Sequence, residues 1–139
     1  MEPQPVWPKH PPEPPPSLWW RLLDRVVESS NTYLTLAAQD GRWQPFAPGV
    51  QIKFLYQRQG VLSYLLQLDA GASIYAHRHA LEEECIVLDG DVQLGSQTEF
   101  GAGSYHVARA GTWHPTLRSR SGALLFLRGA VPPVGYGLR

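Results

Sequence analysis

Apolar and polar residues alternate with a period of two through most of the chain beyond residue 31, which is the pattern of half-buried β-strands. Segment 50–55, for example, carries apolar side chains at Val50, Ile52 and Phe54. Turn residues such as Asp and Gly separate such segments. We therefore predict a loop at 43–49 and short strands at 33–38, 50–55, 61–68, 73–79, 86–88, 92–94, 98–100, 104–108, 112–119 and 123–127. About ten short strands joined by turns predict an all-β sandwich or barrel, such as the double-sheet jelly roll.

The first thirty residues depart from this alternation. Residues 1–16 contain eight of the thirteen prolines, which excludes a helix or a central strand and predicts an extended proline-rich arm. Ser17 suits a helix N-cap, and apolar residues recur at helical spacing through segment 17–30. We therefore predict an arm at 1–16, one N-terminal amphipathic helix at 17–30, a β-barrel domain at 31–130 and a tail at 131–139.

Composition narrows the classes of partner. The 139 residues include 12 basic and 12 acidic side chains, so the net charge is zero, and no basic cluster favours nucleic-acid binding. No apolar run is long enough for a transmembrane helix, and the N-terminus lacks the pattern of a signal peptide. The single cysteine, Cys85, excludes an internal disulfide and fits a reducing cytoplasm.

Candidate chemistry is concentrated between residues 71 and 90. His77 and His79 are two residues apart, so on a strand their side chains project to the same side. Glu83 follows within a few residues, and His114 lies downstream in the sequence GTWHP. Three imidazoles and a carboxylate suit a transition metal better than Mg²⁺ or Ca²⁺. We predict that these four residues hold one divalent metal ion per chain, with Zn or Fe as the leading candidates and Mn or Ni as alternatives.

Residues near this cluster have less specific interpretations. If Glu83 points inward, alternation directs Glu82 and Glu84 outward and Cys85 inward. Cys85 is then either a buried structural thiol or a thiol that senses oxidants beside a metal. We interpret His106, in the middle of a predicted strand, as a hydrogen-bonded structural histidine, with contact to the metal ligands as the alternative.

Two spaced motifs resemble those of the cupin superfamily. The first is Gly-x5-His-x-His-x3-Glu-x6-Gly over 71–90, and the second is Gly-x7-Gly-x2-His over 103–114. The resemblance covers roughly residues 40–128 and is strongest to the cupin group typified by the metal-binding C-terminal domain of the anti-sigma factor ChrR. It implies a double-stranded β-helix, or jelly-roll barrel, and metal ligands at His77, His79, Glu83 and His114. Arg109 stands where the second motif usually has a proline. Arg118 stands where an asparagine often follows the histidine of that motif.

The resemblance supports two classes of function. One is a metal-dependent enzyme, an O₂-dependent dioxygenase that cleaves a small chelating carbonyl compound. The metal sites of the diketone-cleaving cupins resemble three-histidine sites. The presence of Glu83 in this motif therefore argues against a close match to those enzymes. The alternative is a non-catalytic, zinc-binding sensor or regulatory module. Direct anti-sigma activity is not expected, because residues 1–30 leave no room for a ChrR-type helical domain. We expect a cytoplasmic homodimer that binds a small molecule and neither nucleic acid nor membrane.

Overall fold

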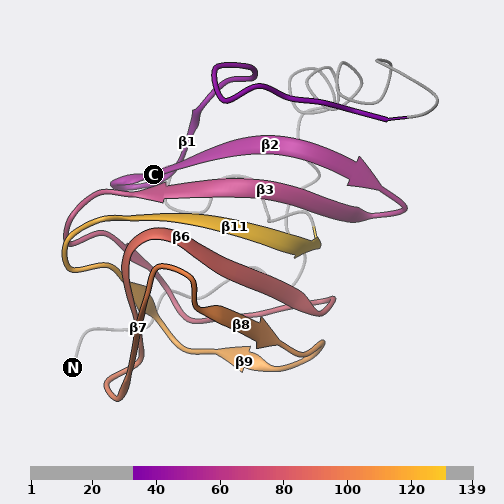
Figure 1. The fold of residues 1–139 in the computed structure, drawn as a ribbon. Coiled ribbons are helices and arrows are strands. Elements are labelled where there is room, and N and C mark those ends of the chain that lie inside the picture. Colours follow the sequence, from indigo (N-terminus) through magenta and orange to yellow (C-terminus); the bar gives the residue numbers. More distant parts are fainter. Residues whose placement is uncertain (1–32, 131–139) are drawn as a thin grey trace.

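The computed structural model of the protein describes residues 33–130, which form β-strands and no helix (Figure 1). The all-β prediction is therefore confirmed for this part of the chain. The strands are β1 (Gln44–Ala47), β2 (Val50–Arg58), β3 (Val61–Leu68), β4 (Ser73–Ile74), β5 (His77–Arg78), β6 (Glu83–Leu94), β7 (Thr98–Gly101), β8 (Tyr105–Ala108), β9 (Trp113–His114), β10 (Leu117–Arg118) and β11 (Ala123–Ala130).

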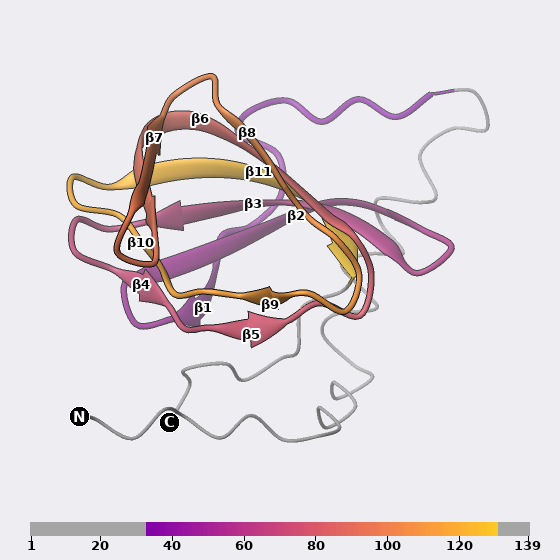
Figure 2. The ribbon, with the colours of Figure 1, turned by 90° about the horizontal axis from the view of Figure 1, so that it is seen from below.

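The strands form a curved, nearly closed jelly-roll barrel. One sheet has the order β1-β2-β3-β11-β6-β10-β4, with β7 and β8 also paired to β6, and β5 and β9 form a separate antiparallel pair. The last strand, β11, lies between β3 and β6 and is antiparallel to both. Figures 1 and 2 show the β5–β9 pair across the interior from β3 and β11.

Alternation along the long strands fills the interior with apolar side chains. Leu125 on β11 lies opposite Leu66 on β3 and Val87 on β6, so the three strands contribute one layer of the core. Burying each side chain of this size stabilises the fold by about 1.5–3 kcal/mol. The core consists of Phe46, Val50, Ile52, Phe54, Leu62, Tyr64, Leu66, Leu68, Cys85, Val87, Val92, Leu94, Leu117, Ala123, Leu125 and Leu127.

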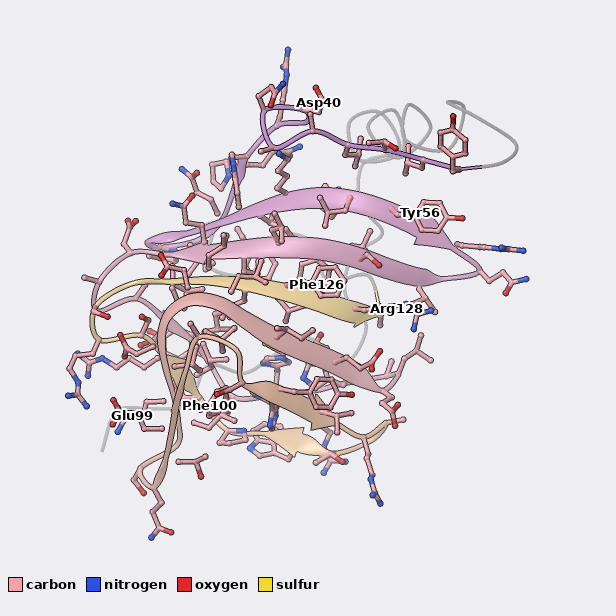
Figure 3. The ribbon with its side chains drawn as sticks, viewed as in Figure 1. Asp40, Tyr56, Glu99, Phe100, Phe126 and Arg128 are labelled. Carbon is pink, nitrogen blue, oxygen red and sulfur yellow. The ribbon has the colours of Figure 1, made fainter. Side chains whose placement is uncertain are left out.

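The outer face of the sheet is divided between covered and exposed parts. Segment 33–43 crosses over β2 (Figure 1), and the buried Lys53 ammonium donates a hydrogen bond of 2.8 Å to the carbonyl oxygen of Ala38. On β11, the half-buried Phe126 and the exposed Arg128 alternate with the inward-facing residues (Figure 3).

Two predictions near the start of the barrel are wrong. Segment 33–38, predicted as a strand, makes no ladder, although its side chains alternate between exposed and half-buried. Segment 43–49, predicted as a loop, contains β1, which pairs with β2. Pro45 lacks a backbone donor, and it is tolerated there because β1 is an edge strand.

Other predicted strands change their boundaries at the corners of the barrel. The predicted strand 73–79 is interrupted at Tyr75 and Ala76, because β4 pairs with β10 whereas β5 pairs with β9. The predicted strand 112–119 is divided into β9 and β10 for the same reason. Conversely, the predicted strands 86–88 and 92–94 are one strand, β6, which continues through Gly90 at a φ of 83°.

The predicted arm at 1–16, helix at 17–30 and tail at 131–139 lie outside the described residues. Within the described part, no helix is long and apolar enough to span a membrane.

Candidate metal centre

Three histidines converge where β5 and β9 pair. His77 on β5 lies directly opposite His114 on β9, and His79 follows β5 immediately. The backbone N–H of Gly111 donates a hydrogen bond of 2.9 Å to the carbonyl oxygen of His79, which ties that residue to the turn before β9. One ring nitrogen from each histidine lies within 4.8 Å of the other two. These three side chains can therefore reach one metal ion.

Hydrogen bonds fix which ring nitrogen can coordinate. The Nδ1 atoms of His77 and His114 lie 2.7 Å and 2.9 Å from the carbonyl oxygens of Tyr75 and Pro115. A carbonyl only accepts, so Nδ1 carries the proton in both rings and the Nε2 lone pair remains for a metal. In His79 the Nε2 atom is buried and has no hydrogen-bond partner among residues 33–130. A buried nitrogen of this kind needs a ligand, and a metal ion fits it.

The electrostatics favour the neutral imidazoles that metals bind. Burial, together with the neighbouring histidines, lowers the pKa of His79 to about 3 and that of His114 to about 4. Burial also lowers the pKa of His77. All three rings are therefore neutral at pH 7 and do not have to lose a proton before they coordinate.

Glu83 lies beside this group at the start of β6. Its Oε2 atom is 3.4 Å from Nδ1 of His79 and accepts a hydrogen bond of 3.0 Å from the hydroxyl of Tyr64. Burial raises the pKa of Glu83 to about 7, while the Tyr64 hydrogen bond opposes the rise. The carboxylate lies outside the group formed by the three histidines, so its role as a fourth ligand stays a prediction.

A glycine on the neighbouring strand makes room for this carboxylate. A Cβ atom on Gly129 of β11 would lie 3.1 Å from the Cβ and Cγ atoms of Glu83, which is tighter than ordinary packing. The absence of a side chain at Gly129 therefore allows Glu83 to lie against β11.

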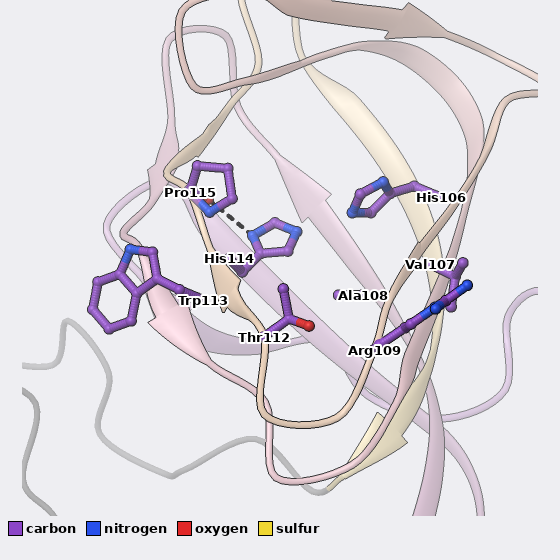
Figure 4. Close-up of a pocket in the computed structure, with 8 residues that line it drawn as sticks. All are labelled: His106, Val107, Ala108, Arg109, Thr112, Trp113, His114 and Pro115. Carbon is purple, nitrogen blue, oxygen red and sulfur yellow. Dashed lines mark hydrogen bonds between the residues drawn. The ribbon is translucent and has the colours of Figure 1, made fainter.

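A pocket of about 280 Å³ opens beside His114 (Figure 4). It is lined by His106, Val107, Ala108, Arg109, Thr112, Trp113, His114 and Pro115. The ring centroid of His106 lies 5.4 Å from that of His114, so this histidine belongs to the site. Its inward direction could not be found in the sequence, because alternation alone would direct the apolar Tyr105 and Val107 inward, whereas in the structure both are exposed.

The side chains of the remaining candidate residues face inward or outward as strand alternation predicts. Cys85 is buried, and burial raises the pKa of its thiol to about 12. Glu84 faces outward, where it accepts a hydrogen bond of 2.8 Å from the hydroxyl of Tyr105. Glu82 and Arg118 are exposed.

The chain combines two motifs of spaced glycines and histidines with a jelly-roll barrel and a histidine cluster inside it. The sequence profile of the ChrR Cupin-like domain matches residues 31–131. The chain belongs to the ChrR Cupin-like family. A comparison with curated proteins gave no match.

Solved structures share the cupin fold at low sequence identity. An acetylacetone dioxygenase from Acinetobacter johnsonii is 18% identical, with a TM-score of 0.62 over 75% of this chain and 76% of that chain. A chain of the Rhodobacter sphaeroides complex of SigE with the anti-sigma ChrR is 23% identical, with a TM-score of 0.59 over 67% of this chain and 50% of that chain. An RmlC-like cupin from Ralstonia eutropha is 26% identical, with a TM-score of 0.60 over 76% and 72%.

Proposed function

We propose that this ChrR-like cupin binds one divalent transition metal through His77, His79, His114 and Glu83. The further part of the proposal is that it acts as an O₂-dependent dioxygenase on a small chelating carbonyl compound. The observation that carries the proposal is the convergence of three neutral imidazoles beside a pocket large enough for a small molecule. The structural similarity to an acetylacetone dioxygenase supports the choice of substrate class.

A bound divalent metal supplies Lewis-acid chemistry for a chelating carbonyl compound, and iron adds redox chemistry with O₂. The protein's own residues prepare the site. The carbonyl oxygens of Tyr75 and Pro115 orient the rings of His77 and His114, which fixes the coordinating nitrogens before a ligand arrives. The hydroxyl of Tyr64 holds one oxygen of Glu83.

The pocket wall supplies binding and partial exclusion of water. Trp113 and Pro115 present apolar surface next to His114, and Arg109 adds a cation to the lining. The enolate of a small carbonyl compound, formed by loss of one proton, carries one negative charge on a short apolar skeleton. Both properties match this mixture of apolar and cationic side chains.

Elemental analysis of tag-free protein tests the metal site. We expect one transition-metal ion per chain in the wild type, loss of that ion in His77→Ala and in His114→Ala, and no loss in the control His10→Ala. The β-sheet signal in circular dichroism should persist in both variants, because the apolar core does not include the two histidines. The absence of metal from the wild type would refute the proposed site.

Oxygen uptake with pentane-2,4-dione tests the reaction. We expect the iron-loaded wild type to consume O₂ in the presence of this compound and His114→Ala not to do so. Iron-loaded protein that retains its metal but never consumes O₂ with any small dione would refute the dioxygenase proposal while leaving the metal site in place.

The alternative function is a non-catalytic zinc-binding regulatory module, which the similarity to a chain of the SigE–ChrR complex favours. Stoichiometric zinc without turnover is the result that would select it. Redox sensing through Cys85 is not favoured, because the thiol is buried and its raised pKa keeps it protonated at pH 7.

We also propose that the protein is a cytoplasmic homodimer that pairs through the outer face of β6 and β8. Ile86, Leu88, Tyr105 and Val107 are large apolar side chains exposed on this face. A second copy of the same face is a self-complementary cover for it. Light scattering coupled to size exclusion should give twice the chain mass for the wild type and the single-chain mass for Ile86→Lys. A monomeric wild type would refute the pairing.

A further inference from the structure

His106 lines the pocket beside His114 and has a buried ring nitrogen without a hydrogen-bond partner among residues 33–130. Its Nε2 atom is one of two buried side-chain polar atoms without a partner among residues 33–130, and the other is Nε2 of the candidate ligand His79. Buried polar atoms in folded proteins are paired in the great majority of cases. The unpaired nitrogen at His106 therefore indicates a partner that residues 33–130 do not supply.

The orientation of His106 is set by its neighbours on both sides. Its ring stacks on Phe100 at 5.9 Å between centroids, with 23° between the planes, and meets His114 edge-on at 5.4 Å and 77°. Figure 4 shows the rings of His106 and His114 pointing toward each other. The ring is thus held in one direction before any ligand enters, which reduces the entropy lost on binding.

The geometry separates His106 from the metal ligands. Only His77, His79 and His114 have ring nitrogens within 4.8 Å of one another among the described residues, and His106 is not in that group. His106 is nevertheless beside the group, because its ring contacts that of His114. A molecule held at the three-histidine site and extending into the pocket would therefore meet Nε2 of His106.

We propose that His106 is a ligand-binding residue, whose Nε2–H donates a hydrogen bond to an oxygen atom of a small organic anion, an enolate or a carboxylate, bound at the metal. The inference rests on the proposed metal site and names the class of its ligand. A bound oxygen atom keeps a second lone pair after coordination, so it can accept from the imidazole.

The charge of the pocket supports an anion. Arg109 lines the same pocket and forms no salt bridge with any carboxylate of residues 33–130. A divalent metal ion and Arg109 together would give the pocket a net positive charge even beside an ionised Glu83, which favours an anionic ligand.

Calorimetric titration of the zinc-loaded protein tests the role of His106 without turnover. The probes are pentane-2,4-dione, which binds metals as its enolate, and acetate. His106→Phe keeps an aromatic ring against Phe100 but removes the donor, whereas His106→Gln replaces Nε2–H by an amide N–H. We expect one zinc per chain in all three proteins. We expect His106→Phe to bind at least one probe about tenfold more weakly, and His106→Gln to recover affinity to within about threefold of the wild type.

Each outcome decides the proposal. Equal affinity of His106→Phe and the wild type for every probe that binds would overturn it, and so would loss of zinc from His106→Phe, because His106 would then be a metal ligand. Failure of both probes to bind the wild type would also overturn it. If acetate binds in a His106-dependent way and the dione does not, the inference stands and the proposed dioxygenase substrate fails. If the wild type holds no zinc, the proposed metal site fails and the inference, which rests on it, fails with it. If zinc is retained and the affinities are equal, the inference alone fails.

Discussion

The carboxyl group of Glu83 makes the stability of the metal-free protein depend on pH in a direction that the structure predicts. The side chain is 12% exposed, and its burial raises the pKa from 4.5 to about 7. The folded state therefore binds a proton at Glu83 over a pH range in which the unfolded state has released it. A raised pKa of this kind contributes stability that is fully present below pH 4.5 and is lost as the pH rises through 7.

The magnitude follows from the two pKa values. Between pH 5 and pH 8, the proton at Glu83 contributes roughly 2.5 kcal/mol to the free energy of unfolding at the acidic end and almost nothing at the alkaline end. Glu83→Gln places a neutral group of the same shape in the site. The free energy of unfolding of this variant therefore does not fall with pH through ionisation of residue 83. The histidines with lowered pKa values act in the opposite direction, but they are common to both proteins and cancel in the comparison.

Urea denaturation in the presence of a chelator, at intervals from pH 5 to pH 8, measures the difference. We expect the free energy of unfolding of Glu83→Gln, relative to the wild type, to increase by roughly 2.5 kcal/mol across this range. Glu82→Gln changes the adjacent, exposed carboxylate and is the control, which should run parallel to the wild type. A difference between Glu83→Gln and the wild type that stays constant with pH would refute the assignment of Glu83 as a buried carboxyl group with a raised pKa.

Two glycines give further predictions. Gly129→Ala places a methyl group against the side chain of Glu83, so we expect zinc affinity to fall roughly ten- to hundredfold, as measured by chelator competition. Gly101→Ala on β7 is its control, because the added methyl group meets only ordinary contacts, and equal affinities in the two variants would contradict the role given to Gly129. Gly90→Ala combines a φ of 83° with a clash against the carbonyl oxygen of Gly122, so we expect a loss of at least 3 kcal/mol or so in urea denaturation. A loss below about 1 kcal/mol would contradict this packing.

The alternation of apolar and polar residues predicted the direction of side chains better than it predicted which strands pair. Segment 33–38 has the expected alternation, with Leu34 and Leu36 half-buried and Tyr33 and Thr35 exposed, yet it lies on the barrel without joining a ladder. The pattern records which side of an extended segment faces the protein, and that side is the same whether or not a neighbouring strand is available. Pairing depends on which sheet edges are free, which a local pattern does not contain.

Part of the histidine cluster was predictable from local spacing, and His114 was added by the resemblance of the second motif to that of the cupins. The spacing of His77 and His79 places them on one side of the chain, and His114 meets His77 through the pairing of β5 with β9. The sequence predicted that Glu83 joins the histidines, but not that it packs against Gly129, 46 positions further along the chain and on another strand. The contact of His106 with His114 likewise depends on how β8 faces β9 across the pocket.

The position of β11 determines when the barrel can close during synthesis. β11 is the last described strand in the sequence, yet it fills the gap between β3 and β6. During synthesis, both neighbouring edges therefore wait, with their backbone groups unpaired, until residues 123–130 have left the ribosome. The histidines emerge earlier, but Glu83 gains its neighbour on β11 only at that last step. The proposed metal site is therefore complete only once β11 is in place, and a ribosome stalled before residue 123 holds a chain that exposes two open strand edges to other nascent proteins.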